Sequence, residues 1–243
     1  MKPFLVIQLR PEDEAADGEY EAFLGKGGLT ADRTRRVRLD QGPMPALSLD
    51  DYAGVIVGGG PGCVSDDPAG KDPVEARVEA DCLALMPEVT ARDMPFLGCC
   101  YGIGILAHHL GAEVSKARYG EPVGPVPCRV TDEGARDPLL DGLPRAFDAL
   151  VGHKEAVQHL PEGTVHLMAS DPCPFQMIRY GSNVYATQFH PEADGQVFAD
   201  RIRIYRNHGY FPPEEADALT ARVTSHEVTQ PERILQNFIT RYG

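Results

Sequence analysis

Short apolar runs alternate with longer segments of helical spacing along the chain. Continuous apolar runs are typical of strands that are buried on both faces. Such strands are predicted at 4–9, 54–57 and 95–97. Residues 73–91 place apolar side chains along one side of a helix; Pro73 suits its first turn, and Pro87 is expected to break or kink it near its end. A further helix is predicted over 103–110.

The second half of the chain begins with a segment, 120–161, that is rich in proline, glycine and aspartate and predicts short strands and turns. Late strands are predicted at 165–169, 176–180 and 184–189, the last two joined by a hairpin-like turn at Gly181-Ser182-Asn183. Helices are predicted at roughly 195–208, 213–226 and 231–241.

This order of elements predicts an α/β fold, with a doubly wound, mostly parallel sheet and helices on both faces. The chain of 243 residues has no internal repeat and no convincing linker. We therefore expect one domain over 1–243, with a core at 1–195 and a helical extension at 196–243.

Charge and composition limit the partners that the protein is expected to bind. The formal net charge is −13, from 36 acidic and 23 basic residues, and such a surface repels nucleic acids and anionic lipids. The basic cluster of Arg33, Arg35, Arg36 and Arg38 is interpreted as a solvated face. No apolar stretch approaches the roughly 18–20 residues of a membrane span. We expect neither a nucleic-acid nor a membrane partner.

The six cysteines form no C-x-x-C pair and no evenly spaced framework, which favours reduced thiols and a cytoplasmic location. The glycine run Gly58-Gly59-Gly60-Pro61-Gly62 follows a predicted strand, but it is neither a Walker loop nor a dinucleotide fingerprint. Nor do His108 and His109 have a further metal ligand at recognisable spacing. No cofactor or metal is expected.

A cysteine stands at a predicted strand–turn–helix junction, in the pattern Gly98-x-Cys100-x-Gly102. A nucleophile at such an elbow needs a strained backbone, so small neighbours are required two residues away. The N-terminus of the following helix favours a thiolate over a thiol. Cys100 is thus a candidate nucleophile, whereas Cys99 is expected to point to the opposite side and pack in the core.

A cysteine nucleophile needs a base, and the base needs a group that orients it. His190 stands at the end of a predicted late strand, where active residues of doubly wound sheets gather. Glu192 follows across Pro191, so its carboxylate could hold one imidazole nitrogen while the other faces Cys100. These three residues form a candidate catalytic triad.

Three segments together resemble the signature motifs of class I glutamine amidotransferases, with GMP synthase amidotransferase domains and their free-standing relatives as the nearest group. They are Val57–Gly62, Gly98–Gly102 and Gln188–Glu192. The resemblance implies that the chain has the flavodoxin-like fold of class I amidotransferases. It also implies attack of Cys100 on the γ-carboxamide of glutamine, with the oxyanion held by backbone N–H groups of Gly59 or Gly60 and of Tyr101. The product would be ammonia, handed to a synthetase or another acceptor protein.

One position departs from the family pattern. Members that use free glutamine carry Gln four residues after the nucleophile, and here that residue is Gly104. The segment Gly152–Val157 is similar to the part that faces the acceptor in related enzymes, so Lys154 and Glu155 could contact substrate or a partner. An exposed turn before a strand explains this segment equally well.

Three functions therefore stay open. The first is a glutamine amidotransferase that releases ammonia through a γ-glutamyl thioester. The second is a hydrolase of γ-glutamyl peptides or conjugates with the same triad, which Gly104 favours. The third is a catalytically silent binding or regulatory module, against which the intact Cys100, His190 and Glu192 argue.

Overall fold

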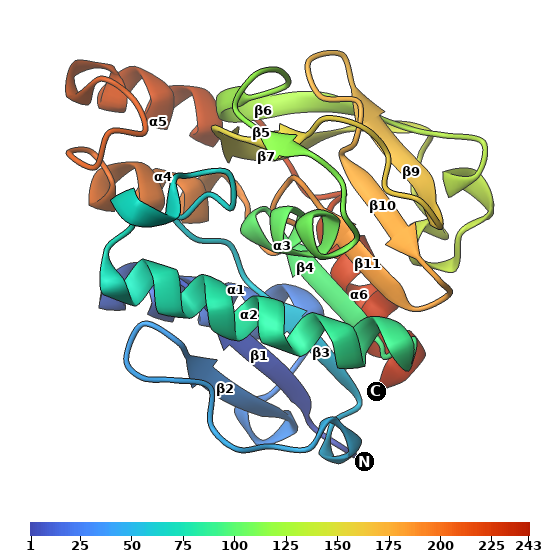
Figure 1. The fold of residues 1–243 in the computed structure, drawn as a ribbon. Coiled ribbons are helices and arrows are strands. Elements are labelled where there is room, and N and C mark those ends of the chain that lie inside the picture. Colours follow the sequence, from blue (N-terminus) through green and yellow to red (C-terminus); the bar gives the residue numbers. More distant parts are fainter.

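The computed structural model describes all residues, 1–243, and its centre is a sheet of nine strands (Figure 1). In spatial order these are β2 (Thr34–Arg38), β1 (Phe4–Gln8), β3 (Gly54–Val57), β4 (Phe96–Cys99), β11 (Val184–Thr187), β10 (Met177–Tyr180), β9 (Thr164–Ser170), β6 (Glu121–Val130) and β7 (Ala146–His153). The first five are parallel, and the pairs from β11 to β7 are antiparallel. A separate small ladder joins β5 (Val114–Ser115) to β8 (Ala156–Val157).

Helices cover both faces of the parallel strands (Figure 1). On one face lie α2 (Pro73–Ala91) and α3 (Tyr101–His109), which contact each other; on the other lie α1 (Asp13–Gly27) and α6 (Glu232–Tyr242). The remaining two, α4 (Gly195–Ile204) and α5 (Ala216–Thr224), pack together, with α4 also against α1 and α5 against β6. The predicted α/β fold with helices on both faces is confirmed.

Strand β1 shows why the apolar runs are continuous. Leu5 and Ile7 point into a core cluster shared with α2 and α3, whereas Phe4 and Val6 point into a second cluster shared with α1 and α6. All four side chains are fully buried. Since successive side chains of a strand point to opposite faces, a strand covered on both faces needs apolar residues at every position.

Helix α1 and strand β2 have no counterpart among the predicted elements. Helix α1 buries small residues such as Ala15 and Ala16, so its sequence lacks the row of large apolar side chains that predicts a helix. Strand β2 contains most of the arginine cluster that was interpreted as a solvated face. It forms the edge of the sheet. Arg36 pairs with Asp17, and Arg38 pairs with both Asp13 and Asp40. Two of the four arginines are therefore neutralised by carboxylates within the chain.

Helix α2 spans the predicted range, 73–91, and does not break at Pro87. It continues through Pro87 to Ala91, although proline removes one backbone hydrogen bond. Met86 and Val89, on either side of Pro87, are buried in the core cluster beneath α2. This packing holds the last turn of the helix in place.

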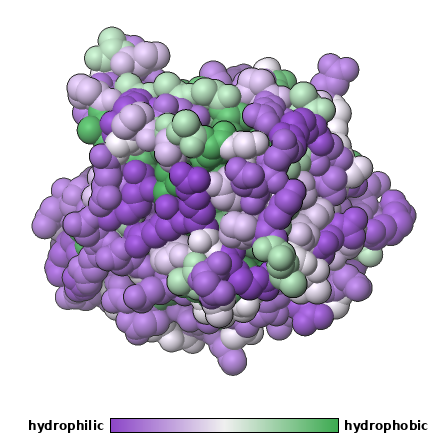
Figure 2. Space-filling view, turned by 90° about the horizontal axis from the view of Figure 1, so that it is seen from below, coloured by the Kyte–Doolittle hydropathy of each residue, from purple (hydrophilic) through white to green (hydrophobic).

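Of the large apolar side chains, only those of Met1 and Val74 are exposed. The face seen in Figure 2 is accordingly mostly hydrophilic, with apolar colour confined to small areas. None of the helices has both the length and the apolar character that crossing a membrane would require.

The segment expected as a helical extension contributes to the core. Helix α6 returns across the sheet, and Ile234, Leu235, Phe238 and Ile239 enter the cluster that also contains Phe4. The Phe238 ring lies 5.9 Å from that of Phe4. The last helix therefore stabilises the strand from which the chain starts.

We expect Phe238→Ala to lower the free energy of unfolding by about 3–5 kcal/mol, because it leaves a cavity under a fully buried ring. Urea denaturation measures this directly. The control Val74→Ala removes methyl groups from an exposed side chain and should change stability by no more than ~0.5 kcal/mol. Equal effects of the two substitutions would contradict the packing of α6 described above.

Candidate active site

Cys100 is the single residue between strand β4 and helix α3. Its backbone is strained, with φ 53° and ψ −93°. Such a conformation costs on the order of 1–3 kcal/mol in a non-glycine residue. Its N–H donates to the carbonyl oxygen of Thr187 on the next strand at 2.7 Å, which fixes the turn. A Cβ on Gly98 would lie 2.9 Å from the Gly102 carbonyl, so the expected need for glycine holds at position 98.

The two adjacent cysteines have different surroundings. Cys99 is the last residue of β4 and is fully buried in the core cluster beneath α1 and α6. Cys100 is partly exposed and lines a pocket. Of the two thiols, Cys100 is thus the one that a small molecule can reach.

His190 and Glu192 follow β11 and are both buried. His190 Nδ1 lies 2.9 Å from Glu192 Oε1, and its main-chain N–H donates to Leu150 on β7 at 3.2 Å. Arg201 Nη1 also lies 3.2 Å from Nδ1, but the carboxylate is closer, so Nδ1 carries the proton in the neutral ring and Nε2 is left as a proton acceptor. This is the tautomer that a general base opposite a thiol requires.

The glycine loop after β3 brings these groups together. A Cβ built on Gly59 would lie 2.6 Å from His190 Cε1, 2.9 Å from Arg10 Nη2 and 3.5 Å from Cys100 Cβ. Any larger residue at position 59 would displace His190 or Arg10. The three segments that the sequence singled out, 57–62, 98–102 and 188–192, thus meet at one point.

The structure distinguishes between the two glycines considered as oxyanion donors. The N–H of Gly59 donates to Glu19 Oε1 at 3.2 Å and is therefore occupied. The N–H of Gly60 has no acceptor within the chain. Tyr101 is the first residue of α3, so its N–H has no acceptor within the helix. Gly60 and Tyr101 offer the free donors beside Cys100.

Three charged residues complete the site and were not singled out in the sequence. Arg201 on α4 donates to Glu192 Oε1 at 2.8 Å, and Arg10 Nε donates to Glu19 Oε1 at 2.8 Å. All of these side chains are buried. The position of Arg10 just beyond β1, at the same edge of the sheet as Cys100, was the only available sequence signal.

Burial and these charges set the protonation of the site. Burial lowers the pKa of His190, with Arg201 adding to the effect and Glu192 opposing it, so the ring is neutral at neutral pH. Burial acts to raise the pKa of Glu192, but His190 and Arg201 outweigh it and hold that pKa well below its usual range. Glu192 is therefore a carboxylate.

Burial opposes the expected activation of Cys100 by the helix N-terminus. Burial raises the pKa of the Cys100 thiol to about 12, although Arg10 and Arg201 pull it downward. The loss of water around a thiolate outweighs the helix dipole, which contributes about 1 kcal/mol near a helix end. The sulfur is a thiol until a base accepts its proton.

The chain was compared with known proteins. The family model described as glutamine amidotransferase class-I matches residues 31–208. The chain belongs to the class I glutamine amidotransferase family. It is 33% identical over 151 residues to the glutamine-hydrolyzing GMP synthase of Thermosipho africanus, covering 62% of this chain and 26% of that protein. It is 30% identical over 171 residues to a glutamine-hydrolyzing GMP synthase subunit of Archaeoglobus fulgidus, covering 70% of this chain and 81% of the relative.

Solved structures have the same fold. A glutamine amidotransferase from Thermotoga maritima aligns with a TM-score of 0.71 at 18% identity, covering 98% of this chain and 99% of that one. One from Methylobacillus flagellatus aligns with a TM-score of 0.70 at 21% identity, covering 100% and 94%. The chain spans about a quarter of the full-length GMP synthases to which it is similar.

Two pockets meet at Cys100. The first, which we call the polar pocket, is bordered by Gly60, Tyr101, Lys154, Glu155 and Gln188. The second, the apolar pocket, contains His190 and Arg10 and is otherwise walled mainly by apolar side chains. Both share Cys100, so a bound molecule can extend to either side of the sulfur.

Glu155 explains the departure at Gly104. Its carboxylate accepts from the N–H groups of Val64 and Ser65, each at 2.9 Å, and it is buried. A Cβ on Gly104 would lie 3.1 Å from Glu155 Oε1. A glutamine side chain at position 104 would therefore need the space that Glu155 occupies. Lys154 lies beside it, with Nζ 4.5 Å from the centre of the Tyr210 ring.

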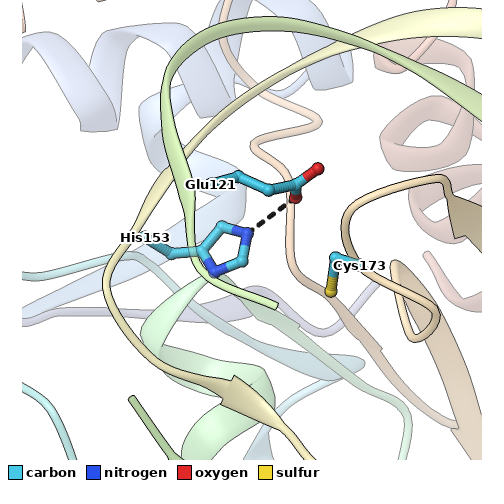
Figure 3. A group of neighbouring side chains, drawn as sticks. All are labelled: Glu121, His153 and Cys173. Atoms are coloured by element: carbon cyan, nitrogen blue, oxygen red, sulfur yellow. Dashed lines mark hydrogen bonds and ion pairs between the residues drawn. The ribbon is translucent and has the colours of Figure 1, made fainter. Parts of the chain in front are cut away.

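A group with metal-ligand chemistry lies behind the polar pocket. Glu121, His153 and Cys173 are buried, with donor atoms within 4.8 Å of one another (Figure 3). His153 Nε2 faces Glu121 Oε2 at 2.8 Å, and Nδ1 faces the carbonyl oxygen of Glu155 at 2.8 Å. Both ring nitrogens are therefore engaged in hydrogen bonds within the chain. The group is accounted for as a hydrogen-bonded cluster that fixes the backbone of Glu155.

We expect alkylation of Cys100 by iodoacetamide to become steadily faster from pH 7 to pH 10, because the thiol pKa is held near 12 and only the thiolate reacts. Peptide mass spectrometry measures the rate at Cys100. Urea-unfolded protein is the control, and there the rate should level off above the ordinary pKa of about 8.5. A folded-state rate that is already constant above pH 6 would show a resting thiolate and contradict this assignment.

Proposed function

We propose that the chain is an amide hydrolase that cleaves the γ-carboxamide of glutamine or a γ-glutamyl relative with Cys100, His190 and Glu192. His190 Nε2 accepts the thiol proton as the sulfur attacks the carbonyl carbon. The negative charge then develops on the carbonyl oxygen, within reach of the free N–H groups of Gly60 and Tyr101. Glu192 holds the imidazolium that forms.

The second half of the reaction releases the products. His190 returns its proton to the departing nitrogen, the C–N bond breaks, and a γ-glutamyl thioester remains on Cys100. Water, deprotonated by His190, then attacks the thioester, so that glutamate leaves and the thiol is restored. Each step uses the same neutral ring as base and its protonated form as acid.

One observation carries this proposal: a cysteine at a strained elbow and a histidine already held by a carboxylate meet at Gly59. A core thiol needs no positive φ, and a structural histidine needs no glycine opposite its ring. The intact set also argues against a silent module. Family membership supports the choice of a glutaminyl amide as the bond that is cleaved.

The polar pocket suits the amino-acid end of the substrate. Glu155 offers a carboxylate for an α-ammonium group, and Lys154 offers an ammonium for an α-carboxylate. Glutamine is the first candidate. A γ-glutamyl peptide or conjugate is the second candidate. Relatives that use free glutamine carry Gln at the position of Gly104, and here Glu155 lies beside that glycine.

We further propose that ammonia, where it is the product, passes to a synthetase or another acceptor protein. The similar proteins are named as glutamine-hydrolyzing GMP synthases, and the one from Archaeoglobus fulgidus is named as a subunit of such an enzyme. One domain over 1–243 and a cytoplasmic location stay predictions.

We expect purified protein to release glutamate and ammonia from a γ-glutamyl amide, and Cys100→Ala to reduce the rate by about a thousandfold or more, because it removes the nucleophile. Coupled assays of both products measure this. Cys99→Ala is the matched control, since it alters the adjacent buried thiol, and it should keep most of the activity of wild type. Activity that survives in Cys100→Ala would contradict the proposed nucleophile.

A further inference from the structure

The guanidinium of Arg10 presents a hydrogen-bond donor that the proposed chemistry does not use. Its Nε donates to Glu19 Oε1 at 2.8 Å, and its Nη1 donates to the hydroxyl of Tyr205 at 3.3 Å. Its Nη2 has no acceptor within the chain, although the residue is only 4% exposed. Nη2 is not sealed in the core, and Arg10 lines the apolar pocket. A buried arginine thus keeps one nitrogen free for a molecule that enters this pocket.

The free nitrogen lies on the side of Cys100 where the departing group must be. A Cβ on Gly59 would lie 2.9 Å from Arg10 Nη2 and 2.6 Å from His190 Cε1, so the guanidinium and the imidazole are neighbours. His190 lines the apolar pocket and is absent from the lining of the polar pocket. Since His190 must protonate the departing nitrogen, whatever that nitrogen carries enters the pocket that Arg10 borders.

The volume of the apolar pocket limits what this group can be. The cavity measures about 50 Å³. A water molecule needs roughly 10–15 Å³ of such space, so the pocket has room for roughly three to five water-sized groups. This is more than a departing ammonia fills and about the size of a carboxymethyl group. A large side chain on the departing nitrogen does not fit.

The second guanidinium at the pocket, that of Arg201, is already engaged, because it donates to Glu192 Oε1 at 2.8 Å. Glu19 offsets part of the charge of Arg10, so the pocket offers the directed N–H groups of Nη2 rather than a large net charge. The acceptor that forms the strongest hydrogen bond with a guanidinium N–H is a carboxylate. Most of the remaining wall is apolar, which excludes water and strengthens such a bond.

We infer that the substrate is a γ-glutamyl derivative of a short amino acid, glycine above all, whose carboxylate accepts from Arg10 Nη2 in the apolar pocket. This inference rests on the proposed function and names its substrate class. The two ends of such a substrate are then held by separate cations, Lys154 in the polar pocket and Arg10 in the apolar pocket.

The reaction needs no component beyond this substrate and water. Cys100 attacks the γ-carbonyl carbon, and His190 takes the thiol proton. The C–N bond then breaks, and the nitrogen of glycine leaves with the proton from His190. Water hydrolyses the thioester, which releases glutamate and restores the thiol.

The test compares γ-glutamylglycine with γ-glutamylglycinamide, which has the same size but no second carboxylate, and with glutamine. Glutamate release by the full chain gives kcat/KM for each compound. We expect γ-glutamylglycine to exceed γ-glutamylglycinamide at least about tenfold, because a hydrogen bond to a charged group changes binding by roughly ten- to a hundredfold. At pH 7 the carboxylate of the glycine unit is fully ionised, since an α-carboxyl group has a pKa of about 3.5.

The variant Arg10→Lys assigns this preference to one side chain. Lysine can keep the charge opposite Glu19, but it has no second nitrogen to face the pocket. The ratio of the glycine to the glycinamide substrate should fall at least about tenfold in Arg10→Lys. The control Arg129→Lys makes the same change at an exposed arginine and should leave the ratio unchanged. The comparison of the two substrates in wild type decides the inference even where Arg10→Lys folds poorly.

Each alternative result has a definite meaning. Glutamate release from glutamine or γ-glutamylglycinamide at least as fast as from γ-glutamylglycine would overturn the inference while the proposed function stands. A preference for γ-glutamylglycine that persists in folded Arg10→Lys would also overturn it, because another group would then bind the carboxylate. Absence of glutamate from all three compounds would reject the proposed function together with the inference.

Discussion

The buried carboxylate of Glu19 is the interaction on which the arrangement of the site depends. It accepts hydrogen bonds from Arg10 Nε at 2.8 Å, from Gln8 Nε2 at 3.0 Å and from the N–H of Gly59 at 3.2 Å, and Arg201 Nη2 lies 3.9 Å away. One fully buried side chain of α1 thus joins the end of β1, the glycine loop and α4. Removing one partner from such a buried network is costly, because the remaining charges lose their compensation.

The charges of this network act on the chemistry at Cys100. Arg10 and Arg201 act to lower the pKa of the Cys100 thiol. Together with burial they also lower the pKa of His190, while Glu192 keeps the ring in the tautomer with Nε2 free. The resting pair is therefore a thiol and a neutral imidazole rather than an ion pair. The proton moves only as the substrate carbonyl is attacked, when the oxyanion donors become useful.

The candidate triad was predictable because short motifs determine its local geometry. An elbow needs Gly98 near Cys100, and a turn at Pro191 brings Glu192 back to His190. The support of the triad was not predictable in this way. Arg10, Glu19 and Arg201 belong to no local pattern, and only the fold makes them neighbours. Helix α1 escaped detection for a related reason, because its buried side consists mostly of small residues such as Ala15 and Ala16, with Phe23 as its only fully buried large apolar residue. The parallel strands, by contrast, were recognisable from their continuous apolar runs, since burial on both faces demands them.

The central claim, that Cys100 is the nucleophile of a γ-glutamyl site, is tested most directly by covalent labelling. A glutamine analogue in which a diazomethyl ketone replaces the carboxamide would carry the electrophile to the sulfur only if it occupies the site as the substrate does. Digestion and peptide mass spectrometry then locate the label. The account predicts one label per chain, on Cys100, with glutamine protecting against it. Labelling of another cysteine, or inactivation with Cys100 unmodified, would contradict it.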